Sequence, residues 1–390
     1  MASLGFGRFV YTAILPSMMK GLGLHYTQMG LLGAGNLSGY LLFAVVGGFL
    51  SVRYGPRLVI GLSLLFLGLC LFLTGLAESL AFALTMRFLT GLGSGAAYIP
   101  MMGLLSSWFA SEKRGMATGI ISTGAGISMI LMGLSMNFLN RLFLDSGWRM
   151  AWHFIGILSI GVGILCSIFL ANRPQEKGFE AIGATGEVSL SGDPLTDWQR
   201  IYRSRPLYLL AFIYFAFGFS HIIYLQYYTA YLIQEIHLSP FQAGRLFSIL
   251  GFLTIFSGPL WGTVSDFIGR GQSLAIVFLL QSFAFFLFAQ PLWGVISSYL
   301  STVLFGLSVF SVPIIMAASA GDFLGPKLAP AALGSITLIF GIGQAMGSPI
   351  GGMIADLSGT FKGAFLLSTL LAIIGLVGSL LLGRLSKGRS

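Results

Sequence analysis

Long apolar segments recur along this chain and are separated by short polar stretches. Each segment runs for about 20 residues, which is the length that a helix needs to cross a bilayer of about 30 Å. The pattern therefore predicts an all-α membrane protein with twelve transmembrane helices. Their expected ranges are 2–20, 29–50, 58–77, 80–106, 116–139, 150–171, 206–232, 243–264, 272–291, 294–318, 332–354 and 363–383.

One polar stretch is much longer than the others. It covers 172–205, carries acidic residues among glycines and serines, and has three arginines towards its end. It separates six predicted helices from six others, and such a polar segment is typical of a linker. We expect an N-terminal six-helix bundle at 1–171, a cytoplasmic linker at 172–205, and a C-terminal six-helix bundle with a short cytoplasmic tail at 206–390.

The composition supports a membrane protein and argues against a soluble one. Hydrophobic residues make up 56% of the chain and charged residues only 8%, whereas soluble domains carry about 25% charged residues. The net charge of +9 does not indicate a nucleic-acid partner, because the basic residues lie between apolar segments. Cys70 and Cys166 both fall inside apolar segments, so we expect neither a disulfide framework nor a metal site, and no cofactor.

The distribution of basic residues predicts the orientation. Cytoplasmic loops of membrane proteins carry an excess of lysine and arginine. With both termini in the cytoplasm of a bacterial cell, so that the chain crosses the inner membrane, four basic residues fall in outer loops: Lys20, Arg141, Arg149 and Lys362. The inner loops and tail then hold Arg53, Arg57, Lys113, Arg114, Arg173, Lys177, Arg200, Arg203, Arg205, Arg270, Lys327, Arg384, Lys387 and Arg389.

The two halves of the chain also resemble each other. Gly5–Tyr11 lines up with Gly218–Tyr224 at an offset of 213 residues. Parallel repeats of six helices, with a substrate site between them near the membrane midplane, are typical of secondary transporters. Matches at offsets of 213 to 215 occur between Gly93 and Pro100 and Gly306 and Pro313, between Gly119 and Gly126 and Gly334 and Gly341, and between Gln28 and Gly30 and Gln242 and Gly244.

A short glycine-rich loop carries the family resemblance. Gly262–Arg270, with the sequence GTVSDFIGR, resembles the signature Gly-xxx-Asp-xx-Gly-Arg of the major facilitator superfamily. Its first-half counterpart, Gly48–Arg57, has Val52 where the acid belongs. An acid that pairs in only one conformation would bias a conformational equilibrium. The alternative is an ordinary basic inner loop. The residues expected to act in gating are Arg53, Arg57, Asp266, Gly269 and Arg270.

Two further segments resemble the same superfamily. Arg87–Gly91 is similar to its Arg-xxx-Gly signature, and Gly119–Gly126 to its glycine-rich fifth helix. The opening Gly5–Pro16 looks like the start of the YbfB/YjiJ-type bacterial carriers. The resemblance implies two pseudo-symmetric bundles and transport by alternating access.

The many glycines have two interpretations. Gly91, Gly93 and Gly95 could suggest a phosphate-binding loop, but no Gly-Lys-Ser/Thr sequence is present and the run lies within a predicted helix. Small residues at four-residue spacing, such as Gly343 and Gly347, allow membrane helices to pack closely. We therefore predict a packing role.

Charged residues within the predicted helices are the best candidates for a site, because a charge inside the bilayer is costly and usually functional. Arg8, Arg87, Arg245 and His221 lie in the spans, whereas all twelve acidic residues fall in loops or at span ends. Cations without a carboxylate should attract an anion, and an arginine fork suits a carboxylate. Alternatives are hydrogen bonds to helix carbonyls or snorkelling for Arg8, a tie between helices for Arg87, snorkelling for Arg245, and a packing role for His221.

Polar and aromatic residues near these charges complete the predicted substrate site. Tyr227 and Tyr228 could instead belong to an aromatic belt at the membrane surface. His221 can change charge near physiological pH, so it could also carry a proton. The predicted substrate-binding residues are Arg8, Tyr11, Thr12, Arg87, His221, Tyr224, Tyr227, Tyr228, Ser311 and Gln344.

These features predict a monomeric secondary transporter, not an enzyme, that moves a small organic anion, with a carboxylate expected and proton coupling as a further hypothesis. The aromatic and methionine content leaves open an exporter of amphipathic or drug-like compounds. A membrane solute sensor without transport is the alternative from a different class.

Overall fold

The computed structural model describes residues 1–109, 111–180, 182, 204–324 and 328–387. Most of the predicted linker and three of the predicted inner basic residues, Arg200, Arg203 and Lys327, lie outside this part of the chain, as does Arg389. The described residues are almost entirely helical, and no strand occurs among them. The all-α membrane fold predicted from the sequence is confirmed.

The described part of the chain contains ten stretches that are long and apolar enough to cross a membrane. One of them, Ala117–Phe169, contains two of the helices, α5 and α6, and the first predicted span is divided into two short pieces. The helices of the first half are η1 (Ala2–Phe9), α1 (Tyr11–Leu22), α2 (Tyr26–Tyr54), α3 (Pro56–Thr74), α4 (Leu80–Trp108), α5 (Ser111–Phe143), η2 (Leu144–Ser146), α6 (Gly147–Phe169) and η3 (Pro174–Lys177).

The second half has the same order of long helices. Its tenth predicted span, 294–318, is not one helix but two, α11 and α12. The helices are α8 (Arg205–Gln234), α9 (Pro240–Ile268), α10 (Arg270–Ala289), α11 (Val295–Gly306), α12 (Ser311–Leu324), α13 (Ala329–Ser358) and α14 (Lys362–Lys387).

Side chains from neighbouring helices explain why the break between α11 and α12 is tolerated. Backbone polar groups inside a membrane need partners when a helix is interrupted. Trp261 Nε1 donates to the carbonyl of Leu307 at 2.9 Å, and Gln281 Nε2 donates to that of Ser308 at 3.2 Å. The amide of Phe310 donates to Ser257 Oγ at 3.1 Å. The hydrophobic pattern could not reveal this break, because the residues on both sides of it are apolar.

The first predicted span also departs from a regular α-helix. Residues 2–9 form a π-helix, and α1 begins after Val10. π-helical segments are uncommon and are frequently found at functional sites. Arg8 lies in the last turn of this segment.

The contacts of the chain group it into two compact units, Met1–Val188 with Gln226–Gly251, and Ser189–Leu225 with Phe252–Ser390. The contact-based division thus assigns the end of α8 and the start of α9 to the first unit. The domain boundaries at 171 and 206 remain a proposal from the sequence.

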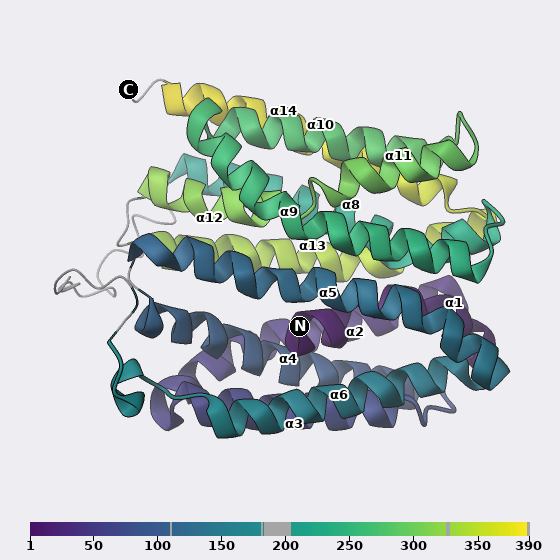
Figure 1. Ribbon diagram of the computed structural model, residues 1–390. Helices are drawn as coiled ribbons and strands as arrows, with labels where there is room; N and C mark the ends of the chain where they lie inside the picture. The colour runs from purple at the N-terminus through teal and green to yellow at the C-terminus, as the bar shows by residue number, and fades with distance from the viewer. Residues whose placement is uncertain (110, 181, 183–203, 325–327, 388–390) are drawn as a thin grey trace. The chain divides into compact units, whose positions relative to one another are not determined.

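Glycines set the packing of the helix pairs within each unit. Figure 1 shows α3 alongside α6, and α10 alongside α14. A Cβ at Gly68 would stand 2.8 Å from the carbonyl oxygen of Gly156, and one at Gly271 would stand 2.5 Å from the Cα of Gly383. The packing role predicted for the glycines is confirmed at Gly91, because a Cβ there would overlap the carbonyl oxygen of Asn36 on α2. The same holds for Gly93, Gly95, Gly343 and Gly347.

Local geometry confirms the internal repeat. Gly55 has φ +86° and ψ 143°, and Gly269, 214 residues later, has φ +90° and ψ 153°. Residues other than glycine rarely adopt this backbone conformation. At the same offset, the side chain of Gln28 accepts from the backbone amide of His25 and that of Gln242 from the amide of Ser239, both at 3.0 Å.

We expect Gly91→Ala to destabilise the protein, because the added methyl group has no room between α4 and α2. Overpacking of this kind costs about 1–3 kcal/mol. Thermal unfolding of the purified protein in detergent measures the effect. Gly103→Ala, on the same helix, is the control, since a Cβ there meets nothing within 4 Å. Equal unfolding temperatures for the two variants would contradict the packing role.

Candidate functional site

A buried guanidinium group lies in the first unit. Arg87 on α4 is only 1% exposed. Its Cζ lies 4.8 Å from the ring centroid of Tyr11 and 5.2 Å from that of Trp152, and its Nη1 donates to the carbonyl of Gly7 at 3.2 Å. Its Nε is buried without a hydrogen-bond partner in the described structure. Two aromatic faces stabilise the positive charge, and one N–H of the guanidinium has its hydrogen-bonding capacity left over.

Arg8 belongs to the same group of side chains. It is partly buried, and its Cζ lies 5.6 Å from the ring centroid of Phe9 and 6.0 Å from that of Tyr40. The charge of Arg8 acts electrostatically on Arg87. Between the chain start and residue 111 the only acidic residue is Glu78, which is exposed just before α4. The first unit therefore holds two neighbouring cations on segments that carry no internal carboxylate, which favours binding of an anion.

Several predicted site residues of the first unit make hydrogen bonds to the backbone. Tyr11 donates its hydroxyl to the carbonyl of Met29 at 2.8 Å, and Tyr227 to that of Tyr26 at 3.1 Å. The carbonyl of Thr12 accepts from the hydroxyl of Thr229. These bonds tie the end of α8 to α1 and α2. Tyr228 is fully buried, with its ring 6.1 Å from that of Phe247.

In the second unit His221 and Gln344 meet. Nε2 of the imidazole lies 2.9 Å from Nε2 of the Gln344 amide, and Nδ1 lies 2.7 Å from the carbonyl oxygen of Phe217. Both side chains are buried, at 4% and 1% exposure. The structure thus joins two residues that the sequence predicted on separate helices.

Tyr224 and Ser311 lie in packed surroundings in the second unit. The hydroxyl of Tyr224 is 2.7 Å from Ser301 Oγ, and its ring lies 4.3 Å from that of Phe305 and 4.5 Å from that of Phe288. Ser311 donates to the carbonyl of Ser308. These polar groups therefore have partners within their own unit.

The second-half signature loop forms an ion-pair network. Arg270 donates through Nη1 to Asp266 and to Ser265 Oγ, and through Nε to Asp322 at 2.9 Å. The network joins the end of α9, the start of α10 and the end of α12. Gly269 provides the turn that makes it possible, since its φ is +90°.

The first-half loop is held differently. Val52, at the position of the missing acid, is 89% exposed. Arg57 donates through its backbone amide to Asn172 Oδ1 and through Nε to the carbonyl of Ser167, both at 2.9 Å. Its guanidinium thus caps the end of α6, while Arg53 is exposed beside the ring of Tyr54. Hydrogen bonds to neutral groups replace the ion pairs of the other half.

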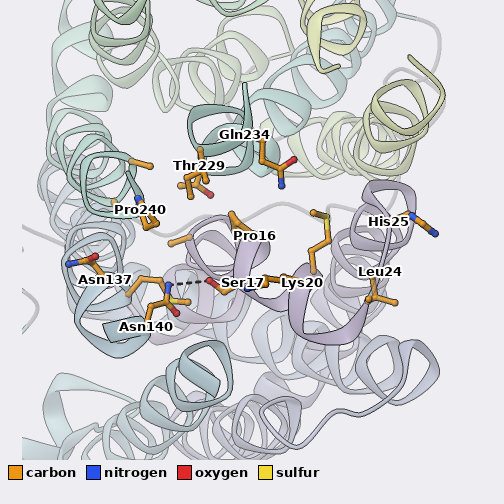
Figure 2. A pocket seen from close by; sticks show the side chains of 17 residues that line it. Pro16, Ser17, Lys20, Leu24, His25, Asn137, Asn140, Thr229, Gln234 and Pro240 are labelled. Atoms are coloured by element: carbon orange, nitrogen blue, oxygen red, sulfur yellow. Dashed lines mark hydrogen bonds between the residues drawn. The ribbon is translucent and has the colours of Figure 1, made fainter. Parts of the chain in front are cut away.

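A cavity of about 590 Å³ also lies within the first unit, next to the predicted outer loops. Figure 2 shows Asn140 donating to Ser17, a bond of 3.1 Å, at one side of it. None of the predicted substrate-binding residues lines this cavity. Its polar lining residues include Ser17, Lys20, His25, Asn137, Asn140, Thr229 and Gln234.

Trp152 and Asn36 are the site residues that sequence reasoning did not single out as ligand-positioning groups. Trp152 covers one face of Arg87, and Asn36 donates to the Arg87 carbonyl at 3.1 Å. Trp152 lies 65 positions after Arg87 in the chain. No local pattern links the two, so only the packing of α4 against its neighbours reveals the contact.

Comparison with known proteins gives consistent results. A family model described as Major Facilitator Superfamily matches residues 1–337 and 210–390. A protein named probable sulfoacetate transporter from Cupriavidus necator is 24% identical over 95% of this chain and 88% of its own length. A hexuronate transporter from Bacillus subtilis is 26% identical over 92% of this chain and 86% of its own. The fold matches a bacterial homologue of the human lysosomal transporter Spinster, solved in an inward-facing, unoccupied conformation. The TM-score is 0.77 and the sequence identity 16%, over 98% of this chain and 95% of that one.

We expect Asp266→Asn to slow transport while substrate affinity stays within a few-fold, because the lost carboxylate supports the Arg270 network and not a ligand. Transport rates in proteoliposomes and binding isotherms measure the two effects separately. Asp145→Asn is the control, since it removes an ion pair between two exposed side chains. Loss of binding with a normal rate at saturation would contradict a gating role.

Proposed function

The chain belongs to the major facilitator superfamily, and we propose that it is a secondary carrier that moves a small organic anion by alternating access. A carboxylate is the group that we expect it to recognise. The observation that carries this proposal is the pair Arg8 and Arg87, on segments without an internal acid. The names of the two relatives, which refer to sulfoacetate and hexuronate, support the same class of substrate. We place the protein in a bacterial inner membrane as a monomer.

Arg8 is the proposed anchor for the anion. It remains protonated at any physiological pH, and its planar fork can donate two hydrogen bonds to one carboxylate. Arg87 lies behind it, fixed between Tyr11 and Trp152. We propose that Arg87 reinforces the positive potential at the site, while Arg8, which is less buried, contacts the substrate.

His221 is the proposed proton carrier. Neither the α8 segment from Pro206 to Gln234 nor α10 between Gly271 and Ala289 contains an acidic residue. An imidazole can change its charge between pH 5 and 8, so His221 is the group in α8 that suits this role. We propose that its protonation is linked to anion transport.

A carrier and a sensor are distinguished by counterflow. Proteoliposomes loaded with unlabelled sulfoacetate or glucuronate should accumulate the same compound in labelled form. Binding in a thermal-shift assay without counterflow would favour a sensor. Preference for amphipathic cations over both anions would favour an exporter of drug-like compounds.

We expect Arg8→Lys to weaken anion binding by about tenfold or more, since a point charge replaces a two-pronged donor. Isotherms with sulfoacetate and glucuronate measure the change. Arg245→Lys is the matched control, because Arg245 is exposed on α9. An unchanged dissociation constant in the Arg8 variant would remove the anchor from the proposal.

We expect His221→Gln to keep anion binding but to flatten the dependence of uptake on pH, because glutamine cannot be protonated. Uptake from pH 5 to 8 is the measurement. His153→Gln, at a partly buried histidine of α6, is the control and should keep the wild-type profile. A wild-type profile in the His221 variant would refute proton carriage by this residue.

A further inference from the structure

Both ring nitrogens of His221 have a partner, and one partner fixes the position of a proton. The Phe217 carbonyl, 2.7 Å from Nδ1, can only accept a hydrogen bond, so Nδ1 carries a hydrogen. In the neutral ring Nε2 then has a lone pair. The nearby Gln344 amide, at 2.9 Å, can fill it by donating from its NH2 group.

The same contact can serve the charged ring. A protonated imidazole donates from both nitrogens, so Nε2 then needs an acceptor. A glutamine amide presents a donor at one end and an acceptor at the other, and its terminal torsion is soft. Turning the amide over by about half a rotation brings Oε1 to Nε2. The contact between the two side chains is therefore kept in both charge states.

Aromatic rings hold the imidazole in place while its charge changes. The ring of Phe217 stacks on it at a centroid distance of 4.3 Å and an interplanar angle of 8°, and the ring of Phe340 at 5.6 Å and 9°. Aromatic faces attract a cation. The stack keeps Nε2 directed at Gln344 and leaves the amide as the group that turns.

Charged residues on the helices of this stack lie at the helix ends. The helices are α8, α13, and α10, which contributes Phe278 edge-on to Phe217. Their charged residues other than His221 are Arg205, Arg270 and Asp356. Tyr214 on α8 is a titratable member of the stack, with its ring 4.4 Å from that of Phe340.

We propose that Gln344 is a positioning residue for proton uptake at His221, and that its amide turns over when the imidazole gains a proton. The inference deepens the proposed function and rests on its claim that His221 carries a proton. It gives Gln344 a role that acts through His221 and not through the substrate.

Nitrogen NMR of protein labelled with 15N-histidine tests this without a substrate. The chain has four histidines, and the signal missing from His221→Gln identifies His221. In wild-type protein Nδ1 should stay protonated throughout the titration while Nε2 changes. A neutral ring with its hydrogen on Nε2 would overturn the proposal even if no variant folds.

Two substitutions should move the pH midpoint of the His221 signal in opposite directions. Gln344→Glu places a carboxylate at Nε2, which favours the charged ring and should raise the midpoint by about one pH unit or more. Gln344→Met removes the acceptor that the charged ring needs and should lower it. Gln281→Glu and Gln281→Met are matched controls, since Gln281 is a fully buried glutamine of α10.

The outcomes separate this inference from the proposed function. Unchanged midpoints in both Gln344 variants would overturn the role of Gln344, while anion counterflow would still support a carrier. A His221 signal that does not titrate between pH 5 and 8 would overturn both the proton claim and this inference. Absence of counterflow with midpoints shifted as expected would overturn only the transport proposal.

Discussion

A positive charge buried in the hydrocarbon layer is the constraint around which the first unit is built. Such a charge costs at least about 3 kcal/mol on the mildest scales unless it is compensated. Arg87 is compensated by the π faces of Tyr11 and Trp152 and by the carbonyl of Gly7. None of these groups carries a negative charge. The positive potential therefore persists, and an anion that enters the site supplies the missing charge.

This arrangement depends on close backbone packing. Asn36 reaches the Arg87 carbonyl because glycines bring α2 and α4 together, with Gly91 against Asn36 and Gly47 2.6 Å, measured from an added Cβ, from the Cα of Ala96. Lipid offers no hydrophobic force that would push helices together, so small residues are needed for van der Waals contact. The glycines of the second signature thus serve the site indirectly, since they fix the helix that carries Arg87.

The sequence revealed the helices and the repeat because both leave periodic signals. Twelve apolar segments and a constant offset near 214 residues are properties of the chain itself, and the paired turns at Gly55 and Gly269 follow the same repeat. The break between α11 and α12 could not be predicted, because its hydrogen-bond partners, such as Trp261 and Gln281, come from other helices. The contact between His221 and Gln344 escaped prediction for the same reason, although both residues were candidates.

The two halves have diverged in the chemistry that they hold. At corresponding positions of the repeat the first half has Arg8, whose charge is permanent, and the second has His221, whose charge can change. Their inner loops differ in the same sense, since Arg57 caps a helix through neutral groups whereas Arg270 bridges two carboxylates. Ion pairs that are partly exposed form and break at small net cost, whereas caps on helix carbonyls persist with the helix. The duplication therefore supports a division of labour in which the first half provides fixed charge for the anion and the second half provides the groups that can change state.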